Sequence, residues 1–128
     1  MTTFLAAVDK KETAEYLLEY LRDRIDDGDT IYAVNSQRGG DDTSDDEVAD
    51  GKAALDQFEE VLGAEGHQLV RGNSPQEDIM QFARDHDVDE LVIAIRKRSP
   101  TGKMLFGSTA QDLLLETDRP VVTVPRQR

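Results

Sequence analysis

The chain of 128 residues carries 27 acidic and 15 basic residues, which gives a formal net charge of −12, and it contains no cysteine. This length fits one domain with its own core, and the lack of cysteine excludes disulfides, thiolate metal sites and a cysteine nucleophile. Because an acidic surface repels nucleic-acid phosphates and no apolar run approaches the ~20 residues of a membrane span, we expect a single cytoplasmic domain, residues 1–128, without nucleic-acid or membrane partners.

Five short apolar runs predict strands that are buried on both faces of a sheet. The first of these runs, Phe4–Val8, is almost continuously apolar, and the last begins with a proline. The expected strands are residues 4–8, 30–34, 67–71, 90–95 and 120–124.

Apolar residues at helical spacing predict four helices between these strands. The first helix begins at Glu12 and ends before the acidic turn at residues 26–29, and the second ends near Gly63. The third begins with Ser74-Pro75-Gln76-Glu77 and the fourth with Ser108-Thr109-Ala110-Gln111, and both sequences have the form of a capping box. On the fourth helix the residues predicted to face inward are Ala110, Leu113 and Leu114.

Residues 37–47 lie between the second strand and the second helix and are rich in Gly, Asp and Ser. A segment this polar cannot bury enough apolar surface to pack, so we predict a flexible acidic loop over about 37–47. Its acidic residues do not follow the EF-hand pattern, and neither His67 nor His86 has a partner at metal-ligand spacing. No metal site is therefore predicted.

The alternation of five strands with four helices predicts right-handed crossovers. The expected fold class is α/β, a three-layer open sandwich in which a five-stranded parallel sheet carries helices on both faces. Sheets of this kind bind their ligands at the carboxyl ends of the strands. The loops that follow the strands are therefore the place to look for a site.

The acidity itself has two interpretations. Aspartate dominates the acidic residues and lysine is scarce. This composition is either an ordinary solubilising surface or an adaptation to high salt, where the Debye length falls to ~3 Å at 1 M and screens the repulsion between carboxylates. The excess of aspartate over lysine favours a halophilic protein, and we expect a halophilic archaeon as its source.

Residues 96–103, Arg-Lys-Arg-Ser-Pro-Thr-Gly-Lys, concentrate four of the 15 basic residues directly after the fourth strand. They lead to Gly107-Ser108-Thr109, which opens a helix whose free N–H groups favour an anion. Gly102 and Gly107 permit a close approach of the backbone to a ligand. The segment is not a Walker A loop, because Met104 follows Gly102-Lys103. It is either an anion pocket or a solvated basic loop beside an ordinary helix cap.

Several sequence features together resemble the universal stress protein (UspA-like) family. Asp9 closes the first strand, Arg71-Gly72-Asn73 leads into the third helix, and Val88-Asp89-Glu90-Leu91-Val92-Ile93 precedes the basic loop. The Gly107-Ser108 helix start is followed by Asp118-Arg119-Pro120-Val121-Val122-Thr123-Val124. The resemblance covers essentially the whole chain and implies an adenine nucleotide alpha hydrolase-like fold.

Nucleotide-binding members of this family carry a motif of Gly, two residues, Gly, nine residues, then Gly-Ser or Gly-Thr. Counting back from Gly107 places Lys97 at the second glycine position and Ala94 at the first, so the end of the motif is intact and its front is altered. The methyl of Ala94 is a modest obstruction. Lys97, with its neighbours Arg96 and Arg98, either closes the pocket or binds phosphate as a point charge. Gly102 restores some freedom to the loop.

The resemblance also implies roles for single residues. It assigns Gly107, Ser108 and Thr109 to phosphate contact, Asp9 to the nucleoside, and Val34 to adenine through its backbone. Read without the resemblance, Asp9 is equally a cap or turn residue.

The predicted function is that of a stress-response regulatory protein that binds ATP or another adenine nucleotide, with or without Mg²⁺, and has no catalytic residues. The resemblance further implies a homodimer formed through the last strand, where Val121, Val122 and Val124 make an apolar edge. Two alternatives remain open: a dimeric interaction module that has lost nucleotide binding, and a slow nucleotide hydrolase that uses Asp9.

Overall fold

A computed structural model describes residues 1–95, 97–98, 104–105 and 108–125, with the backbone alone at residues 42, 97, 98, 104, 105 and 108. Its main feature is a five-stranded parallel sheet in the order β3-β2-β1-β4-β7. The strands are β1 (Thr3–Ala7), β2 (Thr30–Gln37), β3 (Glu65–Val70), β4 (Glu90–Ala94) and β7 (Val121–Val124). The predicted five-stranded parallel sheet is confirmed.

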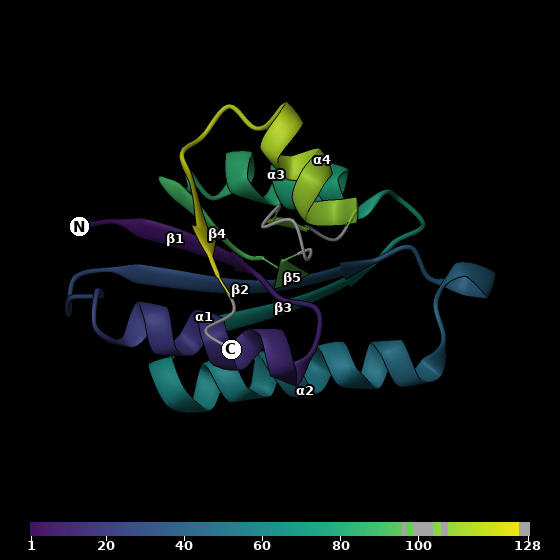
Figure 1. Cartoon of the computed structure of the whole chain (residues 1–128), viewed down its shortest axis with the longest axis horizontal. Helices are drawn as coiled ribbons and strands as arrows, with labels where there is room; N and C mark the ends of the chain where they lie inside the picture. Colours follow the sequence, from purple (N-terminus) through teal and green to yellow (C-terminus); the bar gives the residue numbers. More distant parts are fainter. Residues whose placement is uncertain (96, 99–103, 106–107, 126–128) are drawn as a thin grey trace.

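Helices cover both faces of this sheet, which confirms the predicted three-layer fold. The helices are α1 (Lys11–Arg22), α2 (Asp45–Leu62), α3 (Pro75–Asp85) and α4 (Ser108–Glu116). Helices α1 and α2 lie on one face, and α3 and α4 lie on the other (Figure 1). In the part of the chain that the structure describes, none of the helices combines the length and the hydrophobicity that a membrane span requires.

The chain changes direction across the sheet between β1 and β4. From β1 it proceeds outward to β2 and β3, whereas β4 is followed by β7 on the other side. In an open α/β sheet the crevice beside such a switch point receives the ligand. The strand order therefore places the candidate site at the carboxyl ends of β1 and β4.

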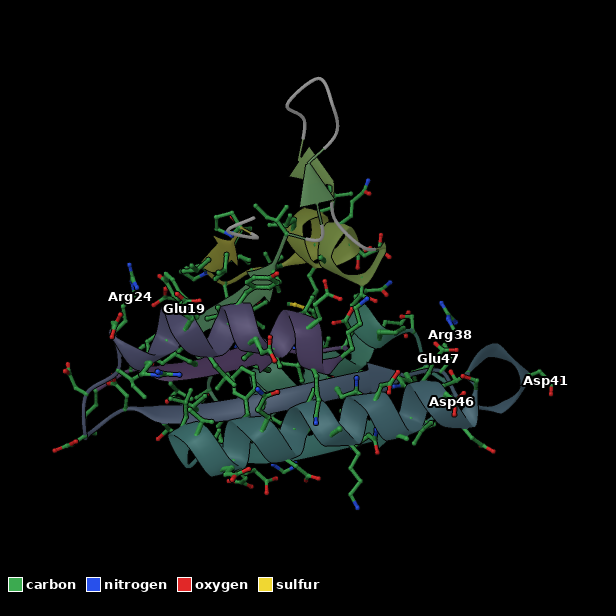
Figure 2. The ribbon with its side chains drawn as sticks, turned by 60° about the horizontal axis from the view of Figure 1, so that its bottom comes forward. Glu19, Arg24, Arg38, Asp41, Asp46 and Glu47 are labelled. Atoms are coloured by element: carbon green, nitrogen blue, oxygen red, sulfur yellow. The ribbon has the colours of Figure 1, made fainter. Side chains whose placement is uncertain are left out.

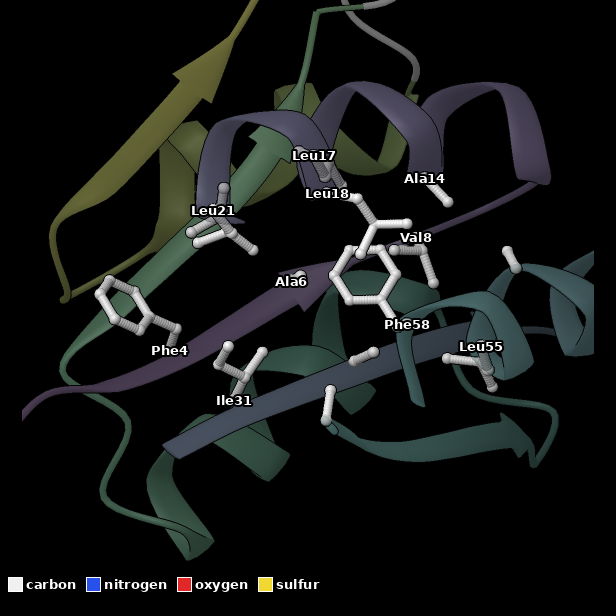
Figure 3. Close-up of a cluster of buried hydrophobic side chains, with 14 of the residues drawn as sticks. Phe4, Ala6, Val8, Ala14, Leu17, Leu18, Leu21, Ile31, Leu55 and Phe58 are labelled. Atoms are coloured by element: carbon white, nitrogen blue, oxygen red, sulfur yellow. The ribbon is translucent and has the colours of Figure 1, made fainter. Parts of the chain in front are cut away.

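Two apolar clusters join the layers, because successive residues of a strand point to opposite faces. On the side of α1 and α2, Phe4, Ala6 and Val8 pack with Phe58, which is fully buried (Figure 3). On the side of α3 and α4, Leu5 packs with residues such as Leu113. The sheet is thus buried on both faces, as its near-continuous apolar strands predict.

The segment predicted as a loop over about 37–47 is shorter in the structure. Strand β2 extends to Gln37, a 3₁₀ turn (η1) spans Gly40–Asp42, and α2 begins at Asp45. The early helix start has a local cause. The Ser44 hydroxyl accepts the Glu47 N–H at 3.1 Å, and the Glu47 carboxylate accepts the Ser44 N–H at 3.2 Å. This is a complete capping box, which satisfies donors at the helix end. The flexibility of the remaining residues stays a prediction.

The capping box predicted at Ser74 does not form. Ser74 does stand at the N-cap of α3 and Pro75 follows it, but the buried Ser74 hydroxyl has no partner among the described residues. The buried Asp78 carboxylate is hydrogen-bonded here instead. It accepts from Asn73 Nδ2 at 3.1 Å and from the Ser36 hydroxyl at 3.2 Å, which ties the start of α3 to β2.

Two further features differ from the sequence-based expectation. On α4, Leu113 is fully buried, as predicted, whereas Leu114 is 36% exposed and lies outside the core. A second, antiparallel sheet pairs β5 (Lys97–Arg98) with β6 (Met104–Leu105). Strands of two residues are too short to show a period in the sequence, so this hairpin was not predicted.

Candidate functional site at the switch point of the sheet

A cavity of about 580 Å³ lies at the carboxyl ends of β1, β2 and β4, as the topology predicts. Its walls also include the first turns of α1, α3 and α4 and the start of α2. The volume falls within the range of small-molecule sites, roughly 300–1,000 Å³.

Four of the predicted site residues meet in this cavity. Asp9 follows β1, Val34 lies in β2, Ala94 ends β4 and Thr109 lies in the first turn of α4, and all four line the cavity. The fold therefore brings together residues that the sequence separates widely. Their contacts with a ligand stay predictions.

The remaining predicted site residues lie wholly or partly outside the description. Arg96, Gly102 and Gly107 are outside the described residues. Lys97 and Arg98 form β5, and Ser108 is the first residue of α4, each with its backbone alone described. The contacts predicted for these six residues are not addressed by the described structure.

Asp9 is exposed at the start of α1. The hydroxyl of Thr13, one turn further along the chain, donates a hydrogen bond to Asp9 Oδ1. Thr13 lines the cavity as well, so the pair forms part of its wall. A carboxylate held in this way can accept hydrogen bonds from the hydroxyl groups of a ligand.

Val34 and Ala94 are integrated into the sheet. The Val34 carbonyl accepts the Val8 N–H at 3.0 Å, which leaves its second lone pair for another donor. Ala94 packs against the apolar cluster on the side of α1 and α2. The methyl group at the first glycine position of the family motif is thus partly accommodated by the core.

The cavity also includes polar residues at the end of β2 that the sequence analysis missed: Asn35, Ser36 and Gln37. Asn35 is only 2% exposed. Its Nδ2 donates to the Val8 carbonyl at 2.9 Å, and its Oδ1 accepts from Gln37 Nε2 at 2.9 Å and from Gln68 Nε2 at 3.1 Å. Three consecutive polar residues after Val34 are typical of the exposed end of a strand. The sequence therefore gave no indication that the amide of Asn35 is buried.

Charges in the described part of the cavity wall are mainly negative. The carboxylates are those of Asp9, Glu47, Asp50 and Asp112, and the cations are Lys10 and Arg38. Figure 2 shows Arg38 and Glu47 together at the side where β2 leads into α2. A phosphate group bound here therefore needs additional positive charge.

Comparisons with known proteins agree with this architecture. The model of the Universal stress protein family matches residues 1–125. The solved universal stress protein from Archaeoglobus fulgidus is 41% identical with a TM-score of 0.77, covering 97% of this chain and 98% of that chain. The universal stress protein from Archaeoglobus fulgidus in complex with dAMP is 36% identical with a TM-score of 0.71, over the same shares of the two chains.

A curated universal stress protein from Mycolicibacterium smegmatis is 45% identical over 53 residues, which is 41% of this chain and 41% of that protein. The family match, in contrast, covers nearly the whole chain, and its fold is the one described above. The chain belongs to the universal stress protein family.

Proposed function

We propose that this protein binds an adenine nucleotide, with ATP as the leading ligand, and acts as a regulator in the stress response rather than as an enzyme. One observation supports this proposal above all: Asp9, Val34 and Thr109 line a single cavity. The family resemblance assigns these three residues to the nucleoside, the base and the phosphates. The dAMP complex of a relative that is 36% identical supports the same ligand class.

In this arrangement the base, the ribose and the phosphates of the nucleotide each lie beside protein groups that can bind them. Half-buried apolar residues of the wall, such as Ala7, Ala94 and Ala110, offer a surface for the base. The Asp9 carboxylate accepts hydrogen bonds from ribose hydroxyls. The phosphates lie at the start of α4, where backbone N–H groups favour an anion.

Phosphate binding beside so many carboxylates requires positive charge. The basic residues at 96–103 stand in the chain between β4 and α4, two elements that line the cavity, and we propose that they supply it. Mg²⁺ would further neutralise the phosphates, and it prefers oxygen ligands of the kind that Asp9 and Asp112 offer in the wall.

Calorimetric titration of the purified protein with ATP, with and without Mg²⁺ in molar KCl, tests this proposal. We expect a saturable heat, and we expect no phosphate release in the same samples. Absence of heat up to millimolar ATP would contradict nucleotide binding and favour the dimeric interaction module. Turnover that disappears in Asp9→Asn would favour the hydrolase instead.

We further propose a homodimer that forms through β7, an edge strand of the sheet. The carbonyls of Pro120 and Val124 accept the N–H groups of Leu91 and Ile95, each at 2.9 Å. Because backbone groups alternate in direction along a parallel strand, those of Val121 and Thr123 face the open edge. Val124 is buried in the core, so the three valines do not form the exposed apolar edge that the sequence predicts. The interface is supported instead by the backbone groups of β7 that face the open edge.

Thr123→Pro is expected to shift the protein from dimer to monomer in sedimentation velocity. Proline removes the N–H that faces the open edge, while the hydrogen bonds between β4 and β7 remain. The control is Thr2→Ala, because Thr2 precedes β1, a strand that β4 separates from β7. A Thr123→Pro protein that stays dimeric and folded would place the interface elsewhere.

A further inference from the structure

We propose that Asn35 is a positioning residue for the nucleoside end of the cavity, an inference that rests on the proposed nucleotide binding. Its side-chain amide holds the carboxyl end of β1 and thereby directs Asp9 toward the ligand. Asn35 lines the cavity, yet it is 2% exposed and acts through its neighbours rather than through broad contact with a ligand.

The side-chain amide of Asn35 continues the hydrogen bonding between β1 and β2 beyond the last backbone pair. The last residue pair in the register is Ala7 with Val34, and the Val8 N–H still reaches the Val34 carbonyl. The next bond is made by a side chain: Asn35 Nδ2 donates to the Val8 carbonyl at 2.9 Å. That carbonyl belongs to the peptide that joins Val8 to Asp9. Its orientation therefore sets the direction in which Asp9 leaves the strand.

Two strands and one helix hold the oxygen end of the amide in place. Asn35 Oδ1 accepts from Gln37 of β2 and from Gln68 of β3. The same two glutamine nitrogens donate to the carbonyls of Glu47 and Val48 in α2, each at 2.8 Å. Because both side-chain ends of Asn35 are bonded, its amide has one orientation, and neither end can rotate without losing a buried hydrogen bond.

Gly51 shows that α2 is adapted to this side chain. A Cβ at Gly51 would lie 2.5 Å from Asn35 Cγ and closer still to Asn35 Oδ1, far inside normal contact. Glycine within a helix is less favourable than alanine, and Gly51 lies well inside α2. The close approach of Asn35 explains why this position lacks a side chain. Gly51 itself does not line the cavity.

The amide contributes to stability, because an apolar side chain at position 35 would leave the Val8 carbonyl and the two glutamine nitrogens without the bonds that Asn35 makes to them. The bond to the Val8 carbonyl in addition lies beside Asp9. We therefore assign the amide to the geometry of the site as well.

The test compares the affinities for ATP and 2′,3′-dideoxy-ATP, because the ribose hydroxyls are the groups that Asp9 accepts from. The wild type is expected to bind ATP about tenfold more tightly than 2′,3′-dideoxy-ATP, because a hydrogen bond to a charged group contributes roughly that much to affinity. Asn35→Ala is expected to remove most of that preference, and Asp9→Ala is expected to remove it as well. Gly51→Ala, which displaces the Asn35 amide, is expected to lower both Tm and the preference.

The double variant Asn35→Ala/Gly51→Ala separates positioning from packing. Its new methyl enters the space that Asn35 leaves, so Tm is expected to rise above that of Asn35→Ala by about 3–6 °C, while the preference for ATP stays lost. Gln68→Ala is the matched control. It removes one donor to Asn35 and the bond to Val48 but keeps the bond to Val8, so it should lower Tm and leave the preference unchanged.

Each outcome has a definite meaning. If the double variant regains the preference together with Tm, Asn35 is a packing residue and the inference is overturned; a wild type without any preference overturns it as well. If the wild type binds neither nucleotide, the proposed function itself fails. Should Asn35→Ala unfold before titration, the double variant alone carries the comparison.

Discussion

Phe58→Ala is expected to lower the free energy of unfolding by about 3–5 kcal/mol, the usual cost of removing a buried aromatic ring. Phe58 is fully buried between α2 and the sheet, where it packs with residues of β1 and α1 (Figure 3). The cavity left by the ring would deprive both helices of contacts that fix them on this face. Urea denaturation followed by circular dichroism in molar KCl measures the loss.

Val61→Ala is the matched control for this prediction, because Val61 lies in the same helix and is 44% exposed. A substitution at such a site usually changes stability by about 0.5 kcal/mol or less. A loss of similar size in both variants would show that α2 is not held on the sheet by Phe58.

Thr109→Trp is expected to weaken the binding of ATP by about 100-fold or more, equivalent to roughly 2.7 kcal/mol of binding free energy. Thr109 lines the cavity in the first turn of α4, at the place proposed for the phosphates. An indole ring there would occupy the space of the ligand and cover the N–H groups of the helix start. Calorimetric titration of the variant with ATP and Mg²⁺ measures the effect.

Gln111→Trp provides the control, because Gln111 lies in the same helix, is exposed and does not line the cavity. Its affinity for ATP should stay within about threefold of the wild-type value, a difference of under roughly 0.7 kcal/mol. Unchanged binding by a folded Thr109→Trp protein would place the nucleotide outside this cavity.

Local patterns were sufficient to predict most elements of the fold. Apolar runs such as residues 4–8 and 90–95 coincide with β1 and β4, and the helical spacing places all four helices between the correct strands. Such periods reflect which side of an element is buried, a property that each segment carries by itself. The same signal fails for the two-residue strands β5 and β6, and for Leu114, whose exposure depends on how α4 sits on the sheet.

Element ends were less predictable because distant side chains decide them. Strand β2 was expected to end at Val34, since polar residues follow, but it continues to Gln37. The polar side chains there are satisfied by other elements: Asn35 bonds to Val8 and Ser36 bonds to Asp78. Likewise Ser44 and Ser74 have the same local pattern, and only Ser44 forms a capping box.

The sequence by itself determined the fold class, the family and four residues of the cavity: Asp9, Val34, Ala94 and Thr109. The fold class follows from the order of the elements, and the four cavity residues come from the resemblance to the family, which rests on motifs that each occupy one short stretch of chain. Only the tertiary structure decided that Asn35 fills the space above Gly51 and reaches the Val8 carbonyl. That relation depends on how the end of β1, β2 and α2 pack against one another, and no pattern along a single segment encodes the packing of three.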